Sequence, residues 1–123
     1  MAKQKKNPLF FLYHIKESIE AICVHLSDGK ESFFHNRTVQ MAVLKELEII
    51  GEAANNIPEE LQQKYSSVPW RDIIDFRNIL AHHYWAIDLN TVWNIINEQD
   101  KLPEVNLKIN LIIDELECNL NQN

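Results

Sequence analysis

Apolar residues recur at spacings of three and four along most of this chain, and that period most constrains what the chain can fold into. Stripes of this kind cover residues 8–27, 38–55, 70–80 and 105–120. A period of 3.6 residues places each stripe on one face of an α-helix. Turn-forming residues are scarce, because the chain holds only 2 glycines and 4 prolines. We therefore predict an all-α fold, an up-and-down bundle of four to five helices.

Glycine and proline positions mark the expected boundaries and one expected close contact. An Asp-Gly pair at residues 28–29 ends the first helix, and residues 30–37 are expected to form a linker. Ser67 and Pro69 are typical of the start of a later helix. Gly51 lies inside the second helix, where glycine costs about 1 kcal/mol relative to alanine. Close approach of another helix is the usual reason to keep such a glycine.

Length and charge limit the class of protein. For 123 residues we expect one helical domain over residues 1–123, with residues 1–7 a candidate for disorder. The net charge of −6 argues against coating nucleic acid by bulk electrostatics, but it leaves a small basic site open. We find neither a signal-peptide pattern nor an apolar stretch of about 18 residues, so we expect a cytoplasmic protein without a membrane span. Cys23 and Cys118 are expected to be buried thiols rather than a disulfide.

The stretch RNILAHHYW, at residues 77–85, gathers polar, titratable and aromatic side chains within a helical pattern. Each residue of an ideal helix advances by about 100° around the axis. Arg77 and Tyr84 are seven residues apart and therefore share one stripe. Asn78 and His82 are four residues apart, so their side chains face the same way and can touch.

Arg77 and His82 are five residues apart, which is about 140° around a straight helix. They form one site only if the helix ends or bends between residues 80 and 83, or if a second subunit of a twofold dimer completes the site. A plainer alternative is that Arg77 forms a surface ion pair with Asp72 or Asp75. His82 is then an ordinary histidine at a helix end.

An arginine and a histidine suffice for RNA cleavage without a metal. Histidine moves protons near neutral pH, and arginine holds phosphate oxygens through its planar fork. The ribose 2′-hydroxyl attacks the adjacent phosphate, and arginine stabilises the crowded transition state. The products are a 2′,3′-cyclic phosphate and a 5′-hydroxyl. On this hypothesis Arg77 and His82 are the candidate catalytic residues, and the reaction needs no cofactor.

Other chemistry-bearing residues give weaker patterns. No Glu-x-x-His pair of the kind found in carboxylate-bridged metal bundles occurs, so we expect no metal site. The residues considered for one were the histidines and glutamates at positions His14, His25, His35, Glu46, Glu48 and Glu52. The tryptophans Trp70, Trp85 and Trp93 are expected in the core or at a dimer interface, with base stacking by Trp85 as an alternative.

Residues 69–96, PWRDIIDFRNILAHHYWAIDLNTVWNII, resemble the HepT-like family of HEPN-domain proteins. The family pattern is an arginine, four residues, a histidine, one residue and a tyrosine, which Arg77, His82 and Tyr84 match. Asn78 fits the polar residue that often follows the arginine. The stretch LEIIGEAANNIP at residues 47–58 and the Leu-Pro break at residues 102–103 also fit, so the likeness spans most of the chain.

The resemblance implies a homodimeric HEPN bundle with the motif at the dimer cleft. It implies a ribonuclease toxin of a type VII toxin–antitoxin module, in which Arg77 and His82 are catalytic and Asn78 supports them. The implied partner is a small nucleotidyltransferase antitoxin that transfers AMP to Tyr84 and so silences the toxin. RNA is the expected substrate, and neither DNA nor a membrane is an expected partner.

A second hypothesis from another class remains open at this point. In this hypothesis the chain is a non-catalytic dimeric helical module, which uses the same cleft to bind a nucleotide or the nucleotidyltransferase partner. The acidic net charge of −6 favours this alternative. The intact set of Arg77, His82 and Tyr84 favours the ribonuclease.

Overall fold

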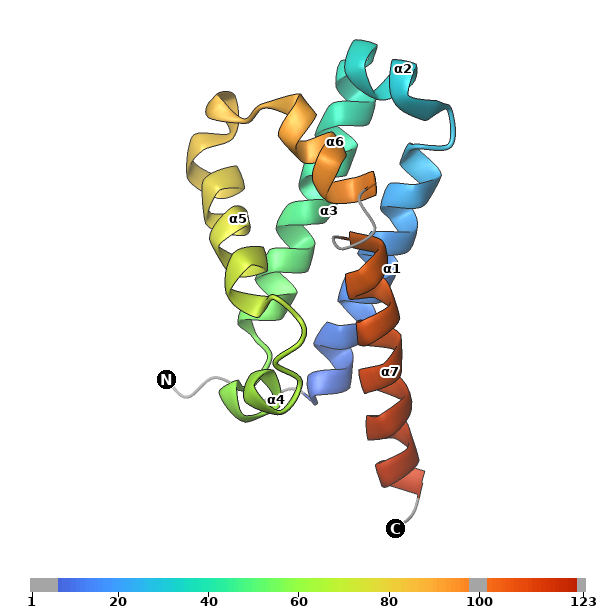
Figure 1. The fold of residues 1–123 in the computed structure, drawn as a ribbon, viewed down its shortest axis with the longest axis vertical. Helices are drawn as coiled ribbons and strands as arrows, with labels where there is room; N and C mark the ends of the chain where they lie inside the picture. The colour runs from blue at the N-terminus through green and yellow to red at the C-terminus, as the bar shows by residue number, and fades with distance from the viewer. Residues whose placement is uncertain (1–6, 98–101, 122–123) are drawn as a thin grey trace.

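The computed structural model describes residues 7–97 and 102–121, which are almost entirely helical (Figure 1). Seven α-helices and one 3₁₀ turn follow one another in these residues, and no strand occurs among them. The elements are α1 (Pro8–His25), α2 (Gly29–His35), α3 (Arg37–Asn55), α4 (Glu59–Lys64), α5 (Trp70–His83), η1 (Tyr84–Ala86), α6 (Leu89–Asn97) and α7 (Leu102–Asn121). The expected disorder at residues 1–7 falls outside this part of the chain except for Asn7. The Asn7 side chain caps α1 by accepting a hydrogen bond from the Leu9 backbone N–H at 2.9 Å.

The four long helices α1, α3, α5 and α7 run alternately up and down (Figure 1). α3 packs against α1 on one side and against α5 on the other, and α1 also packs against α7. The short α6 lies across the upper half of the bundle and contacts α7. The predicted all-α, up-and-down bundle is therefore confirmed. The short α2 and α4 account for the helices beyond the predicted four to five.

The predicted apolar stripes of α1, α3 and α7 form most of the core, whereas in the stripe at residues 70–80 only Trp70 and Leu80 are buried, and Leu120 at the end of the last stripe is exposed. Their fully or almost fully buried members come from α1, α3 and α7, with Ile57 just beyond α3. They are Leu12, Ile15, Ile19, Ile22, Val43, Leu47, Ile50, Ala54, Ile57, Val105, Ile109 and Ile112. Each buried Val, Leu or Ile side chain stabilises the fold by about 1.5–3 kcal/mol relative to exposure. The three-and-four spacing thus fixes which face of each long helix points inward.

The expected linker at residues 30–37 is wrong, because residues 29–35 form helix α2. Gly29 has φ of 92°, a backbone conformation that favours glycine, and it lets the chain turn from α1 into α2. Phe33 is completely buried in the core, and its ring lies 5.5 Å from that of Trp93 on α6. Burial of one large aromatic ring stabilises a short helix that its own propensity would not.

Three further expectations about single residues need correction. Ser67 does not cap α5: the helix begins at Trp70 with Pro69 at the cap position and no side-chain cap. Cys23 and Cys118 are exposed rather than buried, because they lie on the solvent-facing sides of α1 and α7.

No helix in the described ranges combines the length and the apolar character needed to cross a bilayer.

Candidate active site

Helix α5 crosses α3 at Arg77, and Gly51 on α3 makes that crossing possible. A Cβ atom added at Gly51 would lie 2.1 Å from Cβ and 2.8 Å from Cγ of Arg77, and 3.1 Å from the carbonyl oxygen of Ile73. Side-chain carbons do not approach so closely, so any larger residue at position 51 would push the helices apart. The predicted close approach of a helix at Gly51 is therefore confirmed, and the helix is α5.

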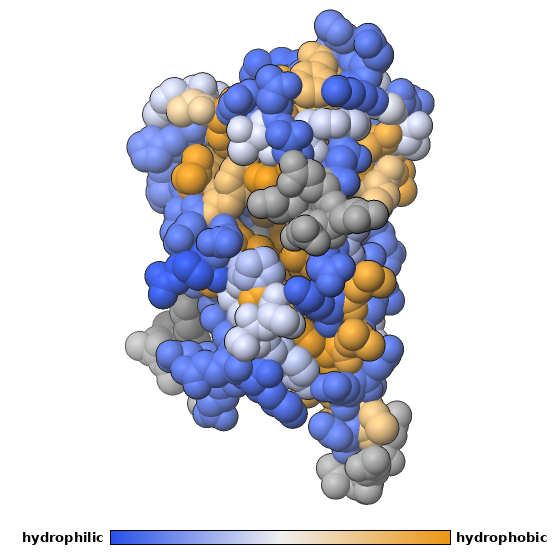
Figure 2. All heavy atoms as spheres, viewed as in Figure 1, coloured by the Kyte–Doolittle hydropathy of each residue, from blue (hydrophilic) through white to orange (hydrophobic). Residues whose placement is uncertain are grey.

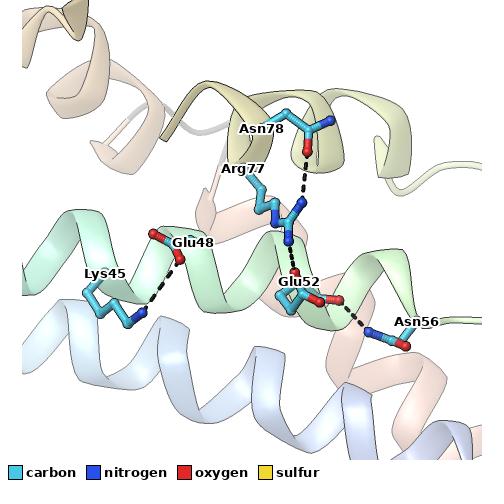
Figure 3. Close-up of polar contacts among 6 residues, drawn as sticks. All are labelled: Lys45, Glu48, Glu52, Asn56, Arg77 and Asn78. Carbon is cyan, nitrogen blue, oxygen red and sulfur yellow. Dashed lines mark hydrogen bonds and ion pairs between the residues drawn. The ribbon is translucent and has the colours of Figure 1, made fainter. Parts of the chain in front are cut away.

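The Arg77 side chain reaches from α5 across to α3, where both ends of its guanidinium group are held (Figure 3). Nη2 donates a hydrogen bond to the Glu52 carboxylate and forms an ion pair with it. Nη1 donates to Oδ1 of Asn78 at 2.9 Å. Nε is buried and has no hydrogen-bond partner within the described ranges. Only 28% of the side chain is exposed, so the fold confines Arg77 on several sides.

The alternative ion pair of Arg77 with Asp72 or Asp75 is wrong, because Glu52 is the partner. Positions two or five residues away on one helix do not face each other, so neither aspartate is placed to meet Arg77. Glu52 lies 25 residues earlier in the chain and meets Arg77 only through the packing of α3 against α5.

His82 lies in the last turn of α5 and is exposed. Its side chain makes no hydrogen bond or ion pair within the described part of the chain. The α-helix runs on through His83, so Arg77 and His82 sit on the same continuous helix, about 140° apart. The structure therefore does not bring Arg77 and His82 together by ending the helix between them.

Tyr84 follows a break in the helix. The backbone at His83 has φ of −141° and ψ of 36°, and Tyr84 begins the 3₁₀ turn η1. The single stripe predicted for Arg77 and Tyr84 is therefore wrong, because it required a continuous helix. Tyr84 is 51% exposed and Trp85 is 72% exposed, and their rings meet edge to face at 5.8 Å. Trp85 is thus not part of the core, unlike Trp70, which is buried.

Sequence reasoning considered Glu52 only as a metal ligand and missed its contact with Arg77. Of the other glutamates weighed with it, Glu46 pairs with His25 at 3.6 Å and Glu48 with Lys45 at 3.5 Å. Residues 7–97 and 102–121 contain no group of three or more His, Cys, Asp or Glu side chains that could hold a metal ion. The signal that could have found Glu52 is its place directly after Gly51, the residue of closest helix approach.

A separate apolar groove of about 430 Å³ opens on the face seen in Figure 2, where apolar side chains gather between α5 and α7. Arg77, His82 and Tyr84 are not among the residues that line it. Its lining includes Leu47 from α3, Phe76 and Ile79 from α5, Ile95 from α6 and Val105 from α7. This groove is therefore a different surface from the one that carries the motif.

Several known proteins are similar to this chain over most of its length. Residues 15–112 match the family described as "Ribonuclease HepT-like". A "Gamma-glutamylcyclotransferase and putative RNase" of Methanocaldococcus jannaschii is 36% identical over 118 residues, 95% of this chain, and the chain spans only about half (52%) of that relative. A "Putative RNase" of the same organism is 36% identical over 114 residues, covering 92% of this chain and 93% of the relative.

A "Probable ribonuclease HepT" of Thermococcus cleftensis is 34% identical over 95 residues, covering 76% of this chain and 86% of the relative. No solved structure matches the chain significantly. The family match covers most of the chain, including the whole of α5 with the motif. This chain therefore belongs to the ribonuclease HepT-like family.

Proposed function

We propose that this protein is a metal-independent endoribonuclease and the toxin of a type VII toxin–antitoxin module. The observation that carries the proposal is the placement of Arg77, which the fold holds by both ends of its guanidinium group in a chain of ribonuclease HepT-like sequence. An arginine fixed in this way is suited to binding a phosphate, because its donors are oriented before the substrate arrives.

In the proposed reaction, Arg77 and His82 act on one phosphodiester of RNA. His82 takes the proton of the 2′-hydroxyl as the oxygen attacks phosphorus, and Arg77 stabilises the charge that develops on the phosphoryl oxygens. The bond from phosphorus to the 5′-oxygen breaks, and that oxygen takes up the proton that His82 carries. The products are a 2′,3′-cyclic phosphate and a 5′-hydroxyl. Asn78 supports the reaction by accepting a hydrogen bond from Arg77.

The proposed active form is a twofold homodimer. Arg77 and His82 of one chain point about 140° apart, so each chain supplies half of a site. In an isologous dimer the same surface meets itself, which brings His82 of one chain toward Arg77 of the other. The exposure of His82, Tyr84 and Trp85 fits a surface that a second copy covers.

The proposed control is transfer of AMP to the Tyr84 hydroxyl by a nucleotidyltransferase antitoxin. Tyr84 is 51% exposed and lies two residues after His82. A partner enzyme can therefore reach its hydroxyl either in a single chain or at the edge of the cleft in the dimer. A nucleotide at this position adds a phosphate that competes for arginine and a bulk that excludes RNA.

The experiment that tests the ribonuclease is cleavage of a mixed RNA pool by the purified protein in the presence of EDTA. We expect products with 2′,3′-cyclic phosphate ends, and no cleavage by Arg77→Ala or His82→Ala. Strict dependence on Mg²⁺, or full activity of His82→Ala, would overturn the mechanism.

A second function, a non-catalytic dimeric module that binds a nucleotide or the nucleotidyltransferase partner, is favoured by two observations. Arg77 already has a carboxylate partner in Glu52, and the chain carries a net charge of −6. Binding of the partner without any RNA cleavage by the wild-type protein would support this second function.

A further inference from the structure

We propose that Glu52 is a positioning residue, a carboxylate on α3 that holds the guanidinium group of Arg77 in the orientation in which it binds the RNA phosphate. This inference rests on the proposed ribonuclease function. It assigns a role to a residue outside the motif, on α3 rather than on α5.

The contacts of Arg77 divide its donors between the protein and the substrate. A guanidinium group has five N–H donors. Nε is buried without a partner in the described residues, Nη2 gives one N–H to Glu52, and Nη1 gives one to Asn78. One N–H on each terminal nitrogen remains for phosphate oxygens. Glu52 and Asn78 hold opposite ends of the fork, so together they fix the plane in which the remaining donors lie.

The position of Glu52 follows from Gly51. The missing side chain at Gly51 lets the backbone of α3 approach to within contact of the Arg77 stem. The next residue, Glu52, then lies beside the guanidinium group, as Figure 3 shows. Two consecutive residues of α3 therefore set both the depth at which Arg77 is seated and the direction in which its donors point.

The opposite role for Glu52 would be that of a competitor, a carboxylate that occupies Arg77 and repels RNA. The two roles predict different effects of neutralising Glu52 on RNA binding and on the cleavage rate. A competitor, once neutralised, leaves an enzyme that binds RNA more tightly. A positioning residue, once neutralised, leaves an arginine with lost orientation and a slower chemical step, because displacement of a reacting group by about 1 Å can cost 10²-fold in rate. Half of the Glu52 side chain (52%) is exposed, so its attraction for Arg77 is partly screened and a phosphate can bind beside it.

Glu48 provides the matched control. It lies one turn before Glu52 on α3 and pairs with Lys45 at 3.5 Å instead of with Arg77 (Figure 3). Glu48→Gln and Glu52→Gln remove the same single negative charge from the same helix. A difference between these two variants therefore reports the contact with Arg77 and not the net charge of the protein.

The first measurement is kcat and KM for RNA cleavage by the wild type, Glu52→Gln, Glu52→Ala and Glu48→Gln. We expect Glu52→Gln to lower kcat about 10-fold and Glu52→Ala up to about 10²-fold, with KM changed little. The amide of glutamine still accepts a hydrogen bond, although a weaker one, so it should retain part of the rate. Glu48→Gln should match the wild type. An unchanged kcat in Glu52→Gln, or a lower KM with unchanged kcat, would overturn the positioning role.

The second measurement needs no activity, so it separates failure of this inference from failure of the proposed function. In ¹⁵N NMR spectra of the arginine side chains, Arg77 should show resolved guanidinium signals with slow rotation in the wild type and in Glu48→Gln. The signals should average in Glu52→Gln, because one end of the fork is released. Identical signals in all three proteins would refute the inference. If the wild type cleaves no RNA but this contrast is present, Glu52 orients Arg77 and only the ribonuclease proposal fails.

Discussion

Arg77 and His82, the two motif residues on α5, differ in how many contacts this chain makes with them. Arg77 is 28% exposed, seated against Gly51 and held by Glu52 and Asn78. His82, five residues later, is exposed, and its side chain makes no hydrogen bond or ion pair within the described residues. In the proposed mechanism, a single chain thus positions the arginine that binds the phosphate, whereas the histidine that transfers the proton depends on a second chain for its surroundings.

The largest expected effect is the loss of activity when Arg77 or His82 is replaced, and the two replacements should differ in their effect on stability. Arg77→Ala and His82→Ala should each lower kcat about 10²–10⁴-fold. Their effects on unfolding should differ, because Arg77 packs against α3 and His82 does not. We expect Arg77→Ala to lower the free energy of unfolding by about 1 kcal/mol, and His82→Ala to leave it within about 0.5 kcal/mol of the wild type.

Urea unfolding followed by circular dichroism checks this contrast. If the two variants are equally destabilised, the proposed difference between a packed Arg77 and an unpacked His82 is wrong, whatever their activities.

The next effect concerns the seat of Arg77. Gly51→Ala places a Cβ atom 2.1 Å from Arg77 Cβ, so α5 or the arginine has to move. We expect a loss of about 1–3 kcal/mol in the free energy of unfolding, despite the better helix propensity of alanine, and a fall in kcat of about 10²-fold. Asn55→Ala, an exposed position one turn later on α3, is the control and should change neither quantity. Wild-type activity in Gly51→Ala would show that the close crossing does not position Arg77.

The sequence predicted the half of this site that depends on local pattern. The stripes of α1, α3 and α7 and the close approach at Gly51 follow from helical period and from the cost of glycine in a helix. The partner of Arg77 did not follow, because Glu52 is 25 residues away and no spacing rule connects two helices. Asp72 and Asp75 were nearer in sequence, but they face away from Arg77 on the same helix.

The sequence left open whether the helix ends or bends between residues 80 and 83, and the structure places the break at His83. Neither glycine nor proline marks it, and the apolar period continues into Leu80 without a stop signal. A continuous helix would place Tyr84 over Arg77, whereas the 3₁₀ turn redirects it. The short α2 was missed for a related reason, since its stability comes from burial of Phe33 in the core and not from its own sequence.

Replacing Tyr84 should change RNA cleavage little, but it should prevent silencing by the proposed AMP transfer. The phenol is exposed and its ring contacts only Trp85 among the ring pairs of the described residues. Tyr84→Phe should keep kcat within a few-fold of the wild type and resist silencing by a nucleotidyltransferase partner with ATP.

Mass spectrometry of the wild type after that incubation should show additions of roughly 329 Da each, the mass of an AMP group, on the peptide that contains Tyr84. AMP on another residue, or complete silencing of Tyr84→Phe, would refute the control step and leave the cleavage mechanism standing.

The central claim is that Arg77 of one chain works with His82 of another, and a heterodimer of two inactive variants tests it directly. Arg77→Ala and His82→Ala chains carrying different affinity tags are coexpressed, and the mixed dimer is isolated by two purification steps. One of its two sites then combines an intact Arg77 with an intact His82, and the other site lacks both. We predict that this heterodimer recovers about half of the wild-type kcat per dimer, because one composite site of two is whole. A heterodimer as inactive as either parent would show that each site lies within a single chain and would contradict the account.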